Sequence, residues 1–301
     1  MEQIQDESKK LSVKESSLFF IFTLGVYFVL SLILSTILSA KMPKGSSINA
    51  YYGKKIWFTC LNYGLFPISF IIVFLIYGKF DKKIYPCVLE RETLHVKYVP
   101  FILAFTFSLI FGFAHANDFF IKFLEKKTSY VSPTTVLPDF SIINFILCTI
   151  FIAILPAICE ELLFRKIIFE SLHEYSVLAR VLISACLFAF FHMNPAQTIY
   201  QFVFGCVFAL TVILTRSDLS NILMHFLNNF FILVIYYGKI EFNKVATIIF
   251  TTIGIILAII CTTFALIHII KRKERKQKLN KELLYLLMPF GLCLILWLVQ
   301  L

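Results

Sequence analysis

Two adjacent carboxylates interrupt a long apolar stretch of the sequence. Glu160 and Glu161 follow residues 140–159, which carry no charge, and Arg165 comes four positions after Glu161. A charged residue at the centre of a membrane costs about 2.5–3.5 kcal/mol, so such residues need a partner or a function. Residues spaced i and i+4 share one face of a helix, so Glu161 and Arg165 can neutralise each other. Glu160 lies about 100° away around the helix and lacks such a local partner, which makes it a candidate for a function.

Two histidines occur in the apolar stretches that follow. His192 comes one helical turn after Phe188 at the end of one stretch. His225 lies between Asn221 and Asn229, and this four-residue spacing gives an otherwise apolar helix one polar stripe. A single histidine in a membrane helix can be a hydrogen-bonded packing residue. Polar groups on three neighbouring apolar stretches favour one shared site.

The path lengths along the chain predict that Glu160 and His192 meet. Their two stretches are expected to form an antiparallel helix hairpin that turns near residues 174–176. Both residues lie about 24 Å from that turn, at 1.5 Å per residue. His225 lies only about 13 Å beyond its own turn at 216–218. It reaches the same depth only if the first hairpin projects further into the cytosol.

The elements that position these residues must be membrane helices. Of the 301 residues, 59% are hydrophobic, 15% are charged and 35 are phenylalanines. A soluble domain has about 25% charged residues, and a globule of this size cannot bury so much apolar surface in one aqueous core. The composition excludes a soluble enzyme, a disordered chain and a disulfide scaffold. We expect a single integral membrane domain over residues 1–301.

Apolar runs of about 20 residues are long enough to cross a bilayer as helices. The runs lie at 17–40, 56–78, 98–116, 141–172, 177–195, 196–215, 219–237, 245–270 and 282–301. We therefore expect an all-α, polytopic transmembrane helix bundle of about eight or nine spans with a polar intramembrane cavity. The polar residues define a core at 140–237, with N-terminal spans in 1–139 and C-terminal spans in 245–301.

The basic residues predict the orientation of these spans. With the N-terminus inside, 19 of the 28 lysines and arginines fall on the cytoplasmic side, and the densest run is 271–276. The positive-inside rule therefore favours a cytoplasmic N-terminus and places residues 271–281 in the cytoplasm. The net charge of +10 is distributed over short segments between apolar runs, as expected for contacts with lipid headgroups. We expect the lipid bilayer of a bacterial cell membrane, and no nucleic acid, as the surroundings.

The polar residues resemble the motifs of the CAAX protease and bacteriocin-processing family of intramembrane endopeptidases. In order along the chain, the motifs are Glu160-Glu161-x-x-x-Arg165, Phe188-x-x-x-His192 and His225-x-x-x-Asn229. Each of them falls on an apolar stretch, and all lie within the core at 140–237. The resemblance implies an all-helical peptide hydrolase of the CAAX endopeptidase type, whose polar residues line a cavity open to one membrane face.

The resemblance also implies a role for each catalytic candidate. Glu160 would be the general base that activates a water, and His192 would help to hold that water. His225 and Asn229 would stabilise the oxyanion of the tetrahedral intermediate. A carboxylate is a suitable proton acceptor in such a cavity, and oxyanion donors commonly contribute about 3–4 kcal/mol.

The same resemblance assigns supporting roles to two residues and raises the question of a metal cofactor. Glu161 and Arg165 would orient the catalytic side chains. Members of the family are often called metalloproteases, and Glu160, His192 and His225 could bind a divalent metal such as zinc, with water as the fourth ligand. Against a metal, the sequence has no HExxH motif and the three residues come from different helices. The use of a metal stays open, with a metal-independent glutamate mechanism slightly favoured.

Three functions compete on these grounds. The first is a peptidase acting on a membrane peptide or a lipidated protein, such as a prenylated C-terminus or a bacteriocin or pheromone precursor. The second is a non-proteolytic membrane protein of the same fold that acts in bacteriocin immunity or as a scaffold. The third is a proton-coupled transporter with the buried Glu and His as its relay, which the lack of internal repeats disfavours. The complete motif set favours the peptidase.

Overall fold

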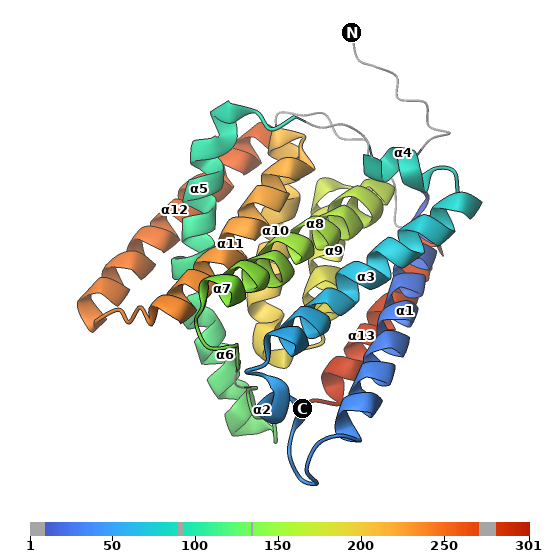
Figure 1. Ribbon diagram of the computed structural model, residues 1–301. Helices are drawn as coiled ribbons and strands as arrows, with labels where there is room; N and C mark the ends of the chain where they lie inside the picture. Colours follow the sequence, from blue (N-terminus) through green and yellow to red (C-terminus); the bar gives the residue numbers. More distant parts are fainter. Residues whose placement is uncertain (1–9, 90–92, 134, 271–280) are drawn as a thin grey trace.

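The chain folds into a bundle of helices (Figure 1). The computed structural model describes residues 10–89, 93–133, 135–270 and 281–301, and these ranges contain no strand. The α-helices are α1 (Val13–Ser39), α2 (Ile48–Tyr52), α3 (Ile56–Phe80), α4 (Ile84–Leu89), α5 (Val99–Phe107), α6 (Ala114–Lys127), α7 (Ile142–Cys148), α8 (Leu155–Glu161), α9 (Val177–Phe191), α10 (Thr198–Thr215), α11 (Asp218–Gly238), α12 (Lys244–Ile270) and α13 (Leu287–Leu298). The predicted all-α fold is confirmed.

Eight helical stretches of the described residues are long and apolar enough to cross a membrane. They are Val13–Ser39, Ile56–Phe80, Val96–Lys127, Ile142–Phe169, Pro195–Thr215, Asp218–Gly238, Lys244–Ile269 and Lys281–Leu298. The outward faces of these helices carry exposed apolar side chains. On α12, for example, Ile248, Ile256 and Ile259 are all more than half exposed. Apolar side chains on such a face are solvated by lipid tails. The protein is an integral membrane protein, as its composition predicts.

One predicted span is shorter than expected. The apolar run at 177–195 contains α9, whose 15 residues are fewer than the roughly 20 that a membrane-crossing helix needs. The helix ends at Phe191 because Met193 adopts a left-handed conformation with φ 48°. A left-handed residue is a common way to terminate a helix.

Another predicted span is longer than expected. The run at 98–116 belongs to a helical stretch that extends over Val96–Lys127. A π-helical turn at Ser108–Gly112 leads directly into the polar helix α6. Gly112 lies within this stretch. It allows a close approach, since a Cβ at Gly112 would lie 2.9 Å from the carbonyl carbon of Gly254 on α12.

Four helices frame the polar residues of the core. α9 and α10 pack side by side, and a Cβ at Gly205 of α10 would lie only 2.6 Å from the Cα of Ala185 on α9. A glycine is required for this approach. α11 packs against α8 and α10, so that α8, α9 and α11 meet around one point inside the bundle.

The orientation of the bundle in the membrane remains a prediction. Residues 271–280, including the densest basic run, lie outside the described residues, and the structure resumes at Lys281. The cytoplasmic placement of 271–281 and of the N-terminus therefore rests on the distribution of basic residues along the sequence.

Candidate active site

The two adjacent carboxylates lie at the end of α8. Two π-helical segments, Thr149–Ile154 and Leu162–Phe169, flank this short helix within one continuous stretch. Such π-helical turns occur frequently at functional sites. Glu161 is fully buried and Glu160 is 8% exposed. The carboxylates are adjacent in sequence, yet they make different contacts.

Glu160 lies between the two histidines. Its Oε2 is 3.7 Å from Nε2 of His192, the residue that caps α9, and 3.9 Å from Nε2 of His225 on α11. The hairpin geometry predicts the meeting of Glu160 with His192, and the structure confirms it. Within the described structure, the buried Oε2 atom has no hydrogen-bond partner. It is therefore available to a water molecule or to a substrate proton.

The position of His225 next to Glu160 is explained by an offset between two helix hairpins. The first is the hairpin that carries Glu160 and His192, and the second is formed by α10 and α11. Nζ of Lys166 lies 3.4 Å from Oδ2 of Asp218, the first residue of α11. The turn before α11 is thus level with Lys166, whereas the first hairpin continues to its own turn at 172–175. The first hairpin projects beyond the second, as the path lengths require. His225 reaches Glu160 despite its shorter path.

Hydrogen bonds fix which nitrogen of each histidine faces Glu160. Nδ1 of His192 lies 2.9 Å from the carbonyl oxygen of Phe188. Nδ1 of His225 lies 3.0 Å from Oε1 of Glu161. A carbonyl oxygen and a carboxylate oxygen both accept, so each Nδ1 carries the donated proton. Nε2 of each ring is therefore the nitrogen that faces Glu160.

Glu161 is held from its other side by Arg165. Nε of Arg165 lies 3.2 Å from Oε2 of Glu161, and both side chains are fully buried. The predicted i, i+4 pair is confirmed. The guanidinium also donates from NH1 to Oγ of Ser184 at 3.0 Å and lies over the rings of Phe188 and Phe208, at 5.2 and 5.5 Å from their centroids. A buried cation needs such contacts to offset its lost hydration.

Asn229 contacts the helical stretch that carries Glu160. Nδ2 of Asn229 donates to the carbonyl of Ile152 at 3.1 Å. This bond uses one of the two N–H groups of the amide.

A short chain of hydrogen bonds also fixes the side-chain oxygen of Asn229. The hydroxyl of Tyr200 donates to Oδ1 of Asn228 at 3.0 Å, and Nδ2 of Asn228 donates to Oδ1 of Asn229 at 3.1 Å. Sequence reasoning did not single out Tyr200, and Ser184 was missed in the same way. Their only signal was a polar residue inside an apolar run. Asn221, by contrast, belongs to the predicted polar stripe but donates to the carbonyl of Phe208 at 2.9 Å.

The three converging side chains can be compared with a metal centre. Ligands of a tetrahedral zinc at 2.0–2.2 Å from the metal lie about 3.3–3.6 Å apart. The two separations from Glu160, 3.7 and 3.9 Å, are longer. In the part of the chain that the structure describes, no group of three or more His, Cys, Asp or Glu side chains is arranged to hold a metal ion. The arrangement does not fit a preformed metal centre.

The core of the chain matches a known family. Residues 142–231 match the family model described as type II CAAX prenyl endopeptidase Rce1-like. The matched range runs from the start of α7 into α11 and includes Glu160, His192, His225 and Asn229. The match is consistent with the CAAX protease and bacteriocin-processing family that the motifs resemble. No curated protein and no solved structure matches the chain.

Proposed function

We propose that this chain, with its Rce1-like domain at residues 142–231, is an intramembrane endopeptidase. It hydrolyses a peptide bond of a membrane-associated peptide or a lipidated protein, and residues 140–237 form its catalytic core. The observation that carries the proposal is the position of Glu160, whose Oε2 lies within 4 Å of Nε2 of both His192 and His225. A carboxylate flanked by two imidazole nitrogens is arranged to bind and deprotonate a water molecule.

In the first step, Glu160 acts as the general base. The water oxygen attacks the carbonyl carbon of the scissile bond while one of its protons moves to Oε2 of Glu160. Nε2 of His192 accepts a hydrogen bond from the second proton and so fixes the direction of attack. The carbonyl π-bond breaks as the C–O bond forms, and the carbonyl oxygen becomes the oxyanion.

The oxyanion is stabilised from the α11 side. The remaining N–H of Asn229 donates to it, and His225 donates through Nε2 in its protonated form. Glu161 stabilises the positive charge of that imidazolium through the 3.0 Å contact with Nδ1. Donors fixed in place before the reaction contribute most to such stabilisation.

In the second step, Glu160 acts as the general acid. It returns its proton to the leaving nitrogen as the C–N bond breaks and the carbonyl re-forms. The products are a carboxylic acid and an amine, and Glu160 is again ionised. The residues of this chain account for every proton transfer in the cycle.

The proposed setting follows from the predicted orientation. The N-terminus faces the cytoplasm of a bacterial cell, and the substrate reaches the site from the membrane. A prenylated C-terminus and a bacteriocin or pheromone precursor are both membrane-associated substrates of the proposed kind. A non-proteolytic role in bacteriocin immunity is the alternative in which Glu160 has no chemical function.

The experiment that tests the proposal compares membrane peptides from three strains. One carries the native chain, one carries Glu160→Ala, and one carries Glu170→Gln, which changes an exposed carboxylate at the end of the same helix. We expect at least one precursor to accumulate with Glu160→Ala and its product to be present in the other two strains. Identical peptide profiles in all three strains would favour the non-proteolytic alternative.

A further inference from the structure

The chain leaves His192 through a constrained turn. Met193 follows it directly and has φ 48°, a left-handed conformation that residues with a Cβ rarely adopt. Such a backbone persists only when contacts around it hold it in place. A relaxation at Met193 would move the adjacent His192, whose Nε2 must stay close to Glu160. The contacts that hold the turn therefore also help to fix the position of His192 next to Glu160.

Tyr130 makes the central contacts to this turn. Its hydroxyl donates to Oδ1 of Asn194 at 3.0 Å and accepts the backbone N–H of Ala196 at 3.1 Å. Oδ1 of Asn194 also lies 3.0 Å from the same N–H. Tyr130 is 4% exposed and packs against Leu124 and Ala196. One buried hydroxyl thus fixes both ends of the turn.

Two other parts of the chain bond to the same region. Nδ2 of Asn117 on α6 donates to the carbonyl of Ala196 at 2.9 Å. Near the C-terminus, Nε2 of Gln300 donates to the carbonyl of Met193. Nε1 of Trp297 donates to Oγ1 of Thr198 at 2.6 Å.

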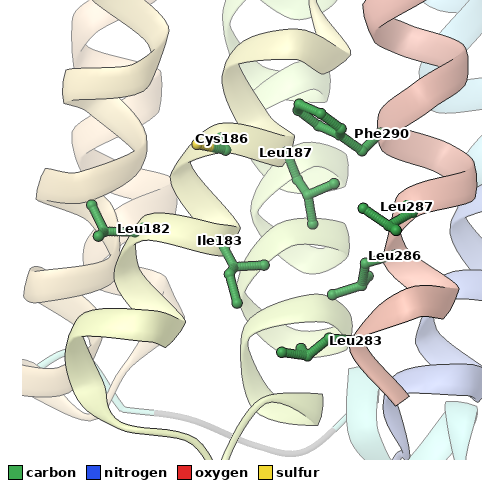
Figure 2. Close-up of a pocket in the computed structure, with 8 residues that line it drawn as sticks. All are labelled: Leu182, Ile183, Cys186, Leu187, Leu283, Leu286, Leu287 and Phe290. Atoms are coloured by element: carbon green, nitrogen blue, oxygen red, sulfur yellow. The ribbon is translucent and has the colours of Figure 1, made fainter. Parts of the chain in front are cut away.

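The C-terminal helix also contacts the part of α9 that leads to His192. An apolar pocket of about 300 Å³ lies between α9 and residues 283–290 and is lined by residues such as Ile183, Leu187 and Leu286 (Figure 2). Phe290, which also lines this pocket, and Trp297 contact the ring of Phe190, with centroids 5.1 and 5.7 Å apart. Phe190 lies two residues before His192, so α13 supports this end of α9.

We propose that Tyr130 is a positioning residue for His192. By fixing the turn at Asn194 and Ala196, its hydroxyl keeps Nε2 of His192 directed at Oε2 of Glu160. Tyr130 lies between α6 and α7, outside the matched residues 142–231, so the Rce1-like domain alone does not contain all that orients its site. The effect expected on turnover rests on the proposed peptidase function; the effect on His192 does not.

The first test is kinetic and uses Tyr130→Phe in the full-length protein. The matched control is Tyr236→Phe. The hydroxyl that it removes accepts the backbone N–H of Leu137. Leu137 lies between α6 and α7, as Tyr130 does, but away from the turn at Asn194 and Ala196. We expect Tyr130→Phe to lower kcat about tenfold with KM little changed, because a small misplacement of a catalytic group is costly. The control should behave like wild type. An unchanged kcat, or a change confined to KM, would overturn the proposal.

The second test reads His192 directly and needs no substrate. The purified proteins are treated with diethyl pyrocarbonate, and the modification of each histidine is followed by mass spectrometry. We expect the rate at His192, relative to that at His225, to rise several-fold in Tyr130→Phe and in Asn194→Ala, which removes the acceptor of the same hydroxyl. The control Tyr236→Phe should match wild type.

The two tests separate failure of the positioning role from failure of the peptidase function. A wild-type protein that cleaves no peptide, together with a raised His192 reactivity in Tyr130→Phe, would remove the proposed function and leave the positioning role in place. Wild-type reactivity at His192 in both variants would overturn the positioning role whatever the activity.

Discussion

Nδ1 of His225 lies 3.0 Å from Oε1 of Glu161, while its Nε2 faces Glu160. The second carboxylate of the pair is thus paired with a histidine and with Arg165, and the first faces the two histidines, where the proposed reaction requires it. This division gives each of two adjacent glutamates a separate role in a membrane helix where each is costly. Glu161 is fixed between His225 and Arg165 at 3.0 and 3.2 Å, whereas the nearest charged or ionisable groups to Oε2 of Glu160 are the two histidine nitrogens at 3.7 and 3.9 Å.

The network around Glu161 predicts a loss of stability on its neutralisation. Glu161→Gln leaves Arg165 as a fully buried cation without its ion pair, which commonly costs about 3–5 kcal/mol. We expect a lower yield of folded protein and a lower thermal midpoint in detergent. Glu170→Gln, whose pair with Arg180 is half exposed on the carboxylate side, is the control. Normal yield and normal thermal stability of Glu161→Gln would contradict the assigned role.

Asn229 is predicted to serve both the helix and the reaction. Asn229→Ala removes an oxyanion donor, which should raise the barrier by about 2–4 kcal/mol. It also leaves the carbonyl of Ile152 without the amide donor, at a cost of about 1–3 kcal/mol in stability. Purified variants would be compared in turnover and in thermal unfolding. Turnover and thermal stability of Asn229→Ala equal to those of wild type would contradict both assigned roles.

The separations around Glu160 predict that turnover does not depend on a bound metal. The oxygen lies 3.7 and 3.9 Å from the two histidine nitrogens, further than the ligands of a tetrahedral zinc lie from one another. Treatment with 1,10-phenanthroline followed by gel filtration should leave the rate unchanged. Loss of activity that added zinc restores would refute the metal-independent mechanism.

The basic residues predict the position of the segment that precedes α13. A single cysteine introduced within 271–281 of a cysteine-free protein should be shielded from an impermeant maleimide in intact cells. A cysteine at the exposed position Lys44, in a segment predicted to be outside, should be labelled. Labelling of the 271–281 cysteine from outside would reverse the predicted orientation.

The parts of this structure that depend on local spacing could be predicted from the sequence. The Glu161–Arg165 pair follows from the i, i+4 rule, and the meeting of Glu160 with His192 follows from equal distances to one turn. The composition also indicates a membrane bundle without any knowledge of tertiary contacts.

Partners chosen by tertiary packing could not be predicted in this way. The bond from Arg165 to Ser184 joins two helices at a depth that no sequence pattern specifies. Asn221 and His225 share one stripe of α11, yet Asn221 donates to a carbonyl of α10 and only His225 joins the site. The short length of α9 depends on the left-handed backbone conformation of Met193. A methionine in the sequence does not predict that conformation.

The turnover of a precursor by purified Glu160→Gln in liposomes tests the central claim most directly. An amide keeps the size and much of the hydrogen bonding of the carboxylate but cannot accept the proton of the water. The account predicts a rate lower by about 10²–10⁴-fold, with the thermal stability and peptide binding of wild type. Cleavage by Glu160→Gln at a rate near that of wild type would contradict it.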